Sequence, residues 1–340
     1  MKVVTFGEIM LRLSPPGIER LLQSPTLSAT FGGAEANVAV SLAHWGCESV
    51  YITRLPAHAI GDAAIRALRA EGVRTDDVQR GGERLGVYFA ESGASQRPST
   101  VVYDRAYSAI SDIDPTSLDW AQLMRGASWF HVSGITPALG PKPARCVADA
   151  LAAAHAARVT TSFDLNFRRK LWSPSEAQAT LHPLLKNVNL VIANEEDLQS
   201  ALGFDVAGID VKTGRVNTAA YRGVIRQVCE LGPTLVAITL RESISASDNG
   251  WSAILGGSAL PEVLESQRYD IRIADRIGAG DAFAAGLIYG TAIGQAPIEA
   301  LRFAVAAGAL KHTIPGDFNR VSVEEVERLA AGDASGRVQR

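Results

Sequence analysis

The sequence predicts an α/β fold: a doubly wound, mostly parallel sheet with helices on both faces and a small antiparallel β lid. Three observations lead to this prediction. Short apolar runs rich in β-branched residues alternate with longer amphipathic segments, the last third of the chain is dominated by helical patterns, and two early segments break the alternation. Strand–helix alternation is typical of βαβ units, whose parallel strands are covered on both faces.

The strands and helices follow from these patterns. Six short, β-branched apolar runs are typical of buried parallel strands. They are residues 3–6, 49–53, 128–132, 159–163, 190–193 and 235–240. Amphipathic periodicity predicts helices over residues 34–45, 63–71, 143–157, 175–185, 219–231, 281–293, 297–312 and 323–330. Right-handed crossovers between such strands place ligands at the carboxyl ends of the sheet.

The two interrupting segments, about residues 9–31 and 84–110, lack helical periodicity and a crossover helix. Residues 85–91 and 100–104 within the second are predicted strands. We expect both segments to leave the main sheet as a lid, which would close over substrate or pack in a homo-oligomer. The predicted organisation is a single domain over residues 1–331, followed by a flexible tail over residues 332–340.

Composition and charge narrow the class of protein. The chain is 47% hydrophobic and 20% charged with a net charge of −3, an ordinary globular balance without the basic footprint of a nucleic-acid binder. No apolar run approaches the roughly 18 residues that a membrane span needs. The N-terminus resembles a strand rather than a signal peptide. We therefore expect a cytoplasmic protein with no nucleic-acid or membrane partner.

The strongest local signal is Asp275-Arg-Ile-Gly-Ala-Gly-Asp-Ala-Phe-Ala-Ala-Gly286. A strand-like run leads into Gly278-Ala279-Gly280, and a helix is predicted to begin at Asp281. Glycines let the backbone approach a ligand closely, and the first N–H groups of a helix have no internal partner. Together they predict an anion hole for phosphate oxygens.

Asp281 would lie beside a phosphate bound in this hole. Phosphoryl transfer needs positioning, charge neutralisation and a proton acceptor, so Asp281 is the predicted base for the attacking hydroxyl. The simpler alternative is that Asp281 only caps its helix. A cap does not explain the two preceding glycines, whereas phosphate binding does. Neither the glycine fingerprint of a Rossmann oxidoreductase nor a P-loop occurs in the sequence.

This segment resembles the C-terminal signature of the ribokinase family, also called phosphofructokinase-B-type carbohydrate kinases. Phe31-Gly-Gly-Ala-Glu-Ala-Asn-Val-Ala-Val-Ser-Leu-Ala-His-Trp-Gly46 resembles the N-terminal signature, about 240 residues earlier, and the resemblance covers most of the chain. It implies a ribokinase-like fold, ATP as donor and Mg²⁺, and it leaves activation by a monovalent cation open. The residues it implies are Asp281 as base, Gly278, Ala279 and Gly280 in the anion hole, and Gly32, Gly33 and Asn37 in the sugar site.

Local alternatives accompany these assignments. Gly32-Gly33 would also suit a tight turn before the helix over residues 34–45, and Asn37 would also suit polar surface. A third family element, Asn-x-x-Glu, organises magnesium and its waters, and Asn194-Glu-Glu-Asp197 matches it after a predicted strand. Asp197 stands where the family usually has glutamate, so Asp197 through an extra water, or Glu196, is expected to serve. An acid-rich helix N-terminus is the alternative without metal.

Side chains on the lid and at the strand ends indicate the acceptor. Tyr88, Tyr103 and Arg105 fall on the predicted lid, and Asp164, Asn166 and Arg168 follow the strand over residues 159–163. Two arginines in one pocket suit a substrate carboxylate, whereas neutral sugars need hydroxyl partners. The alternative is that both arginines are surface cations.

Several stretches, at residues 92–105, 129–135, 164–172 and 239–251, resemble the 2-keto-3-deoxygluconate kinase branch of the family. The resemblance implies a sugar-acid substrate whose terminal hydroxyl faces the γ-phosphate, and it adds one residue to the site, Ile135. Other acceptors stay open: 2-keto-3-deoxygalactonate, fructose or ribose. A catalytically silent sugar- or nucleotide-binding relative is a further alternative.

The nucleotide site is the least defined part of the prediction. Many family members place a glycine-bearing loop after the strand that here covers residues 235–240, but this chain has Arg241-Glu-Ser243. The expected nucleotide-binding residues are Asn194, Thr239, Arg241, Gly278, Gly280 and Gly308.

Overall fold

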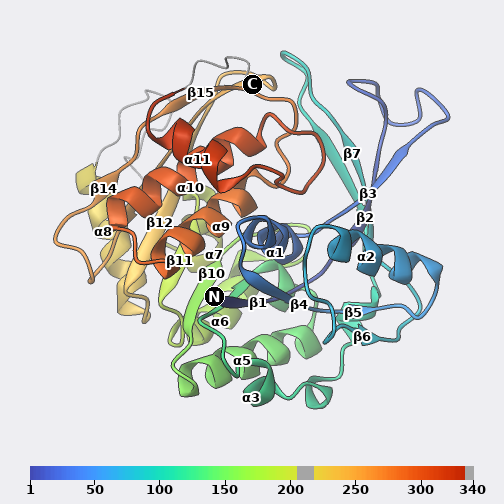
Figure 1. The fold of residues 1–340 in the computed structure, drawn as a ribbon, viewed down its shortest axis with the longest axis horizontal. Helices are drawn as coiled ribbons and strands as arrows, with labels where there is room; N and C mark the ends of the chain where they lie inside the picture. The colour runs from blue at the N-terminus through green and yellow to red at the C-terminus, as the bar shows by residue number, and fades with distance from the viewer. Residues whose placement is uncertain (205–217, 334–340) are drawn as a thin grey trace.

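A mixed sheet forms the centre of the protein in the computed structural model, which describes residues 1–204 and 218–333 (Figure 1). Within these residues the sheet has nine strands in the order β14-β13-β12-β11-β10-β9-β1-β4, with β15 paired to β13. Neighbours from β4 to β12 are parallel, and β13 is antiparallel to β12, β14 and β15. The strands are β1 (Lys2–Phe6), β4 (Glu48–Ile52), β9 (Trp129–Ser133), β10 (Thr160–Asp164), β11 (Leu190–Ala193), β12 (Leu235–Ser243), β13 (Asp248–Gly256), β14 (Leu264–Glu265) and β15 (Tyr269–Arg272).

The predicted fold class is confirmed. The six predicted strands appear within one residue of their expected ends, except that β12 continues to Ser243. The sequence patterns did not reveal β13, because the polar Asp248-Asn249-Gly250 at its start is typical of a turn.

Helices cover both faces of the sheet and divide its core in two (Figure 1). Alternation along β1 illustrates this, since Val4 and Phe6 pack into one core and Val3 into the other. The first core includes α5, α6, α7 and α8, and the second includes α1, α9, α10 and α11. The longer helices are α1 (Ala34–His44), α2 (Ala59–Ala70), α5 (Pro141–Ala156), α6 (Pro174–Leu185), α7 (Glu195–Leu202), α8 (Thr218–Glu230), α9 (Ala279–Ala292), α10 (Pro297–Lys311) and α11 (Val323–Ala330).

One helix start differs from the prediction in a way that matters. We expected a helix from Asp281, but α9 begins at Ala279, and its N-cap Gly278 has a φ of 88°. The left-handed conformation at Gly278 starts the helix two residues earlier, which places Asp281 in the first turn. Short turns complete the helical elements: α3 (Trp120–Leu123), α4 (Ile135–Ala138), η1 (Ala109–Asp112) and η2 (Pro115–Ser117).

A second, four-stranded sheet lies to one side of the main body (Figure 1). Its order is β3-β2-β7-β8, and the strands fall within the two predicted lid segments, except that β3 ends one residue later, at Gly32. The outer pairs are antiparallel as expected. The central pair, β2 with β7, joins the two lid segments and is parallel. The strands are β2 (Met10–Ser14), β3 (Ser28–Gly32), β7 (Val87–Glu91) and β8 (Thr100–Asp104).

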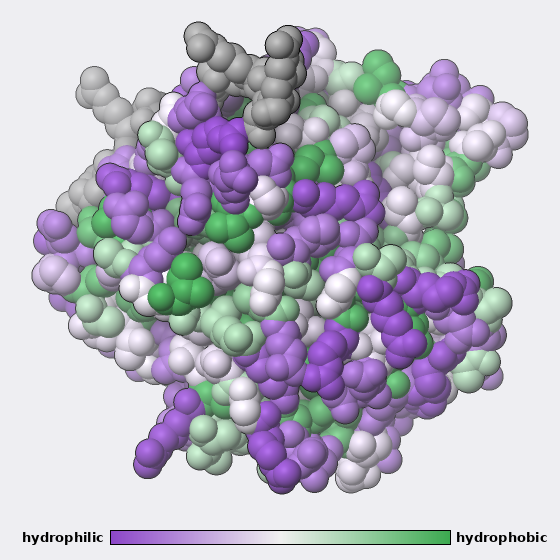
Figure 2. All heavy atoms as spheres, viewed as in Figure 1, coloured by the Kyte–Doolittle hydropathy of each residue, from purple (hydrophilic) through white to green (hydrophobic). Residues whose placement is uncertain are grey.

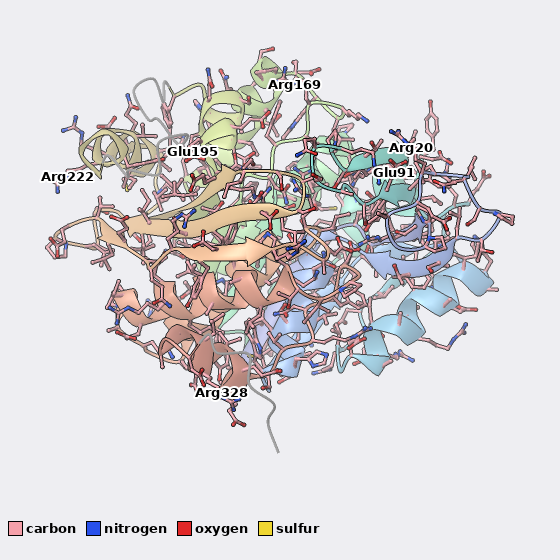
Figure 3. All side chains as sticks on the ribbon, turned by 90° about the horizontal axis from the view of Figure 1, so that it is seen from above. Arg20, Glu91, Arg169, Glu195, Arg222 and Arg328 are labelled. Atoms are coloured by element: carbon pink, nitrogen blue, oxygen red, sulfur yellow. The ribbon has the colours of Figure 1, made fainter. Side chains whose placement is uncertain are left out.

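The two lid segments also meet through side chains. Arg20 and Glu91 lie close together, with 4.0 Å between Nη1 and Oε1 (Figure 3). The lid core of Met10, Tyr88 and Ala90 packs against Ile277, which belongs to the loop that leads into α9. The inner face of the lid therefore covers the predicted anion hole. A separate two-stranded pair, β5 (Arg54–Leu55) and β6 (Gln79–Arg80), lies below it.

The outer surface is mixed in character. Hydrophilic side chains cover most of the face over α1, α10 and α11, with apolar side chains scattered among them (Figure 2). Among the described residues, no helix combines the length and apolar character that crossing a bilayer requires. Residues 334–340 of the predicted tail lie outside the described residues.

Candidate active site

A pocket with a volume of about 330 Å³ opens where β10, β11 and β12 end, between the main sheet and the lid. It brings together side chains that are up to about 300 residues apart in the chain. Of the predicted site residues, those that line it are Gly32, Gly33, Asn37, Tyr88, Tyr103, Arg105, Ile135, Asp164, Asn166, Arg168, Asn194, Asp197, Thr239, Arg241, Gly278, Gly280 and Asp281. Three others, Ala279, Glu196 and Gly308, are not among the lining residues.

The N-terminus of α9 has the features of an anion hole. Its N-cap, Gly278, provides no side-chain cap, and no hydrogen bond among the described residues uses the N–H groups of Ala279, Gly280 or Asp281. A Cβ at Gly278 would lie 2.2 Å from the Asp317 carbonyl oxygen, so only glycine fits this turn. Ala279 is fully buried, and any contribution it makes to a ligand is through its backbone. These unpaired donors can receive an anion.

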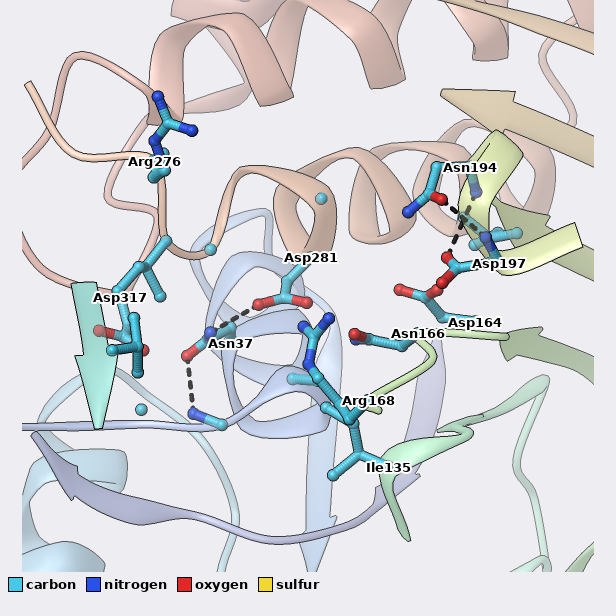
Figure 4. A pocket seen from close by; sticks show the side chains of 18 of the residues that line it. Asn37, Ile135, Asp164, Asn166, Arg168, Asn194, Asp197, Arg276, Asp281 and Asp317 are labelled. Atoms are coloured by element: carbon cyan, nitrogen blue, oxygen red, sulfur yellow. Dashed lines mark hydrogen bonds between the residues drawn. The ribbon is translucent and has the colours of Figure 1, made fainter. Parts of the chain in front are cut away.

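Asp281 faces the pocket beside this hole (Figure 4). Its Oδ2 accepts a hydrogen bond from Asn37 Nδ2 at 2.6 Å, and Asn37 Oδ1 accepts one from the Gly33 N–H at 3.3 Å. The alternative that Asp281 only caps its helix is therefore wrong, because Gly278 holds that position without a side-chain cap. Burial raises the pKa of Asp281 to about 6, while the Asn37 hydrogen bond acts in the opposite direction. A carboxylate of this kind is suited to accept a proton near neutral pH.

A charged network that sequence patterns did not reveal joins the lid to this turn. Arg12 of β2 donates to Asp317 Oδ1 at 2.8 Å and to Asp275 Oδ2 at 2.7 Å. Tyr88 of β7 donates from its hydroxyl to Asp317 Oδ2 at 2.5 Å, so its predicted sugar contact would come from the ring or from a shared hydroxyl. Asp317 comes from the loop after α10, and a Gly316-Asp317 turn was its only sequence signal.

Gly32 is explained by the close approach of the loop that carries Asp317. A Cβ at Gly32 would lie 1.9 Å from Asp317 Oδ2, so Gly32 lines the pocket and also gives Asp317 its place. A tight turn alone does not account for this glycine.

A second buried carboxylate, Glu35, which was also absent from the sequence prediction, holds the wall of the pocket that carries Ile135. Glu35 Oε1 accepts hydrogen bonds from Ser133 N–H and Oγ, both at 2.8 Å, and from Thr136 Oγ1 at 2.7 Å. These bonds tie the start of α1 to the end of β9 and to α4, which carries Ile135. Burial raises the pKa of Glu35 to about 7, against the effect of these hydrogen bonds.

The two predicted arginines differ in availability. Arg105 is buried, and its Nε and Nη2 both donate to Glu8 Oε2, with 2.9 Å for the Nε bond. Arg168 is exposed, lines the pocket and forms no ion pair within 4.0 Å among residues 1–204 and 218–333, although its charge acts on Asp164, Asp197 and Asp281. Of the two, Arg168 is therefore the guanidinium that is free to meet a ligand carboxylate. The alternative that both are surface cations is wrong for Arg105.

Three oxygen-bearing side chains, those of Asn194, Asp197 and Asp164, lie beside the start of α7 (Figure 4). Asn194 and Asp197 form a capping box, and Asp197 also accepts from the Phe167 N–H at 2.9 Å. Burial raises the pKa of Asp197 to about 6. Asp164 lines the pocket, and its carboxylate forms no hydrogen bond among the described residues. Burial and the nearby Asp197 and Asp281 charges raise its pKa.

The prediction that Glu196 could replace Asp197 in the pocket is wrong, because Glu196 does not line it. The Glu196 side chain is 72% exposed and faces a neighbouring hollow, where its Oε1 lies 3.7 Å from Arg169 Nη2. The Asp197 side chain is buried instead. Asn194 and Asp197 thus do cap the acid-rich start of α7. Asp197 also lines the pocket, together with Asp164 at the end of β10.

Of the residues predicted to bind nucleotide, Thr239 and Arg241 line the pocket and Gly308 does not. Arg241 lies over the Trp251 ring with 5.6 Å from Cζ to the centroid, and Thr239 Oγ1 donates to the Ala193 carbonyl at 3.3 Å; both line the pocket. Gly308 does not line it, because a Cβ there would lie 2.9 Å from the Trp251 ring. Gly308 is therefore a packing glycine under Trp251.

Together these features describe a phosphotransferase site: an anion hole at a helix N-terminus, a carboxylate beside it that can take a proton, and oxygen ligands for a cation. The model of the pfkB family of carbohydrate kinases matches residues 1–240 and 257–321. The chain belongs to this family, and it is an ATP-dependent sugar kinase.

Individual relatives agree with this placement. A 2-dehydro-3-deoxygalactonokinase of Haloferax volcanii is 33% identical over 339 residues, 98% of each chain. A 2-dehydro-3-deoxygluconokinase of Bacillus subtilis is 28% identical over 96% of this chain and 94% of its own. The crystal structure of a 2-dehydro-3-deoxygluconokinase from Thermotoga maritima has a TM-score of 0.93 and 50% identity, covering 98% of this chain and 100% of the other.

Proposed function

We propose that this kinase transfers the γ-phosphate of ATP to the terminal hydroxyl of 2-keto-3-deoxygluconate. The similarity to 2-dehydro-3-deoxygluconokinases over nearly the whole chain supports this substrate. The observation that supports the proposal within the pocket is Arg168, an exposed guanidinium that forms no ion pair within 4.0 Å among the described residues. A sugar acid supplies the carboxylate that this cation lacks, whereas a neutral sugar does not.

In this proposal, Asp281 is the base. The substrate hydroxyl oxygen attacks the γ-phosphorus, its proton passes to Asp281 Oδ1, and the bond between the γ-phosphorus and the β,γ-bridging oxygen breaks to release ADP. Asn37 holds Asp281 Oδ2, which leaves Oδ1 to face the hydroxyl. The free N–H groups at the start of α9 stabilise charge on the phosphate oxygens. Tyr103, whose ring lies 5.3 Å from Arg105 Cζ, and Ile135 complete the wall on the sugar side.

The residues present fit a divalent cation bound with the nucleotide. Asp164 is nine-tenths buried, has no partner among the described residues and faces Asp197, which is the donor chemistry that Mg²⁺ prefers. We propose that Asp164 and Asp197, with Asn194, hold the ion through water. When bound, Mg²⁺ neutralises charge on the donor phosphates. Asp164 thereby compensates for the short side chain of Asp197.

Two further expectations belong to this proposal. Activation by a monovalent cation is tested by replacing potassium chloride with tetramethylammonium chloride in the assay. A homo-oligomer formed through the lid is supported by exposed apolar side chains at Ile18, Leu22 and Val102. Light scattering on wild-type and Val102→Glu protein measures whether this face joins subunits.

The test of substrate is an ADP-release assay with magnesium and ATP across 2-keto-3-deoxygluconate, 2-keto-3-deoxygalactonate, gluconate, ribose and fructose. We expect the highest kcat/KM with 2-keto-3-deoxygluconate. The 33% identity to a 2-dehydro-3-deoxygalactonokinase favours the galactonate epimer as second candidate, and a higher kcat/KM for it would replace the first. Preference for ribose or fructose would overturn sugar-acid recognition altogether.

A further inference from the structure

Lys311 is an unusual lysine because its side chain is completely buried. It is the last residue of α10, and its Nζ donates to the Ile314 carbonyl oxygen at 3.0 Å. No carboxylate among the described residues forms an ion pair with it, at an N···O distance of 4.0 Å or less. Burying an ammonium with so few partners costs several kcal/mol, so stability alone does not account for this residue.

The lysine passes directly behind the anion hole. Its Cε lies 3.2 Å from the position that a Cβ on Gly278 would occupy, next to the Asp317 carbonyl. Lys311 is not among the residues that line the pocket. The ammonium therefore acts on the Gly278 turn from the protein side, and it does not contact the ligand.

Several charged groups face this ammonium from the elements around it. Asp275 precedes the turn, Asp281 is on α9, Asp317 follows α10 and Arg12 is on β2. His312, the next residue in the chain, interacts with Lys311 and also with Arg241 and Arg276. Burial lowers the pKa of Lys311, while Asp275 and Asp317 oppose that shift.

The inner part of this group carries an excess of negative charge. Asp275, Asp317 and Asp281 contribute three carboxylates, Arg12 pairs with the first two, and Arg168 acts on Asp281 from the pocket side, so that one negative charge remains in excess without Lys311. A phosphate must approach the same turn while Asp281 stays ionised as a base. These two requirements conflict, because the carboxylates repel the phosphate and each other. A fixed cation behind the turn reduces both repulsions.

We propose that Lys311 is a positioning residue for phosphoryl transfer: its buried ammonium is the counter-charge that lets the Gly278 turn accept phosphate while Asp281 stays ionised. The inference rests on the proposed role of Asp281 as base. Lys311 itself exchanges no proton and contacts no reacting atom, and it acts through the turn and through its field at Asp281.

The decisive variant is Lys311→Met, which keeps the length of the side chain and removes the charge. We expect it to unfold at the wild-type temperature or above, because the buried cation is gone. We expect kcat to fall about tenfold or more. The acid limb of the kcat/KM profile should move to higher pH by about one unit, since Asp281 loses a positive neighbour. A residue needed only for packing would lower stability and leave the acid limb in place.

Two further measurements keep the inference testable if Lys311→Met does not fold. Lys311→Ala leaves a space that methylammonium ions can fill, so added methylammonium should restore activity and the wild-type acid limb, whereas bulkier tetramethylammonium should not. Lys142→Met, which removes a half-exposed lysine paired with Asp112, is the control and should behave as wild type.

The outcomes separate this inference from the proposed function. A folded Lys311→Met protein with wild-type kcat and acid limb would overturn the role of Lys311, and so would a Lys311→Ala protein that ignores methylammonium. Full activity of Asp281→Asn would instead overturn the proposed base. An inactive Asp281→Asn alongside a wild-type-like Lys311→Met refutes only the role of Lys311.

Discussion

The two ends of the pocket balance their charges in different ways. At the α9 end, protein groups hold one another in place by hydrogen bonds: Asn37 donates to Asp281, and Arg12 joins Asp275 to Asp317. After β10, Arg168 is exposed to the pocket and forms no ion pair within 4.0 Å among the described residues, although its charge acts on Asp281. The first arrangement suits chemistry, where donors must already be in place when charge develops. The second suits recognition, where the ligand supplies the missing charge.

The largest effect should come from the α9 end. Asp281→Asn keeps the shape of the side chain and removes the proton acceptor, so we expect kcat to fall about 10²–10⁴-fold. The KM for sugar should change little, because Asn can still pair with Asn37 after its amide reorients. Single-turnover assays measure the loss directly, and near wild-type kcat in a folded variant would contradict the proposed chemistry.

The next largest effect should come from replacing Arg168, and it should appear in the KM for the sugar acid. Arg168→Gln removes a charge-assisted pair with the sugar carboxylate, so we expect the KM for the sugar acid to rise about 10–100-fold. Arg169→Gln is the matched control, because Arg169 is 77% exposed, lies at the surface and pairs with Glu196 (Figure 3). If both variants raise KM equally, recognition is a general effect of positive charge and not of Arg168.

A smaller effect, on the Mg²⁺ requirement, is expected from replacing Asp164. Asp164→Asn should raise the Mg²⁺ concentration for half-maximal activity about tenfold. Mn²⁺ binding in the presence of ATP, measured by electron paramagnetic resonance, reports the same loss without turnover. Glu196→Gln is the control, since its side chain points to the neighbouring hollow. Unchanged Mn²⁺ affinity in Asp164→Asn would assign Asp164 to the sugar instead.

The predictability of the site follows the range of the interactions involved. Gly278, Gly280 and Asp281 are neighbours in the chain, so their shared role could be inferred from local chemistry and from the resemblance to the ribokinase family. Gly308 was misassigned, because a glycine in a helix carries no sign of whether a ligand or the Trp251 ring requires the space. Arg105 was identified as a pocket residue, but its pairing with Glu8 was not, since 97 residues separate the two.

The sequence by itself determined the class of fold, the position of the two lid segments and the glycine turn with its adjacent carboxylate, Asp281. These features depend on periodicity, glycine content and helix starts, which are properties of contiguous residues. Only the tertiary structure decided which charges were already matched. It brought Asp317 and Lys311 behind the turn, paired Arg105 with Glu8 and left Arg168 and Asp164 open to ligands. Electrostatic balance depends on distances and burial in space, and those are set only when remote segments pack together.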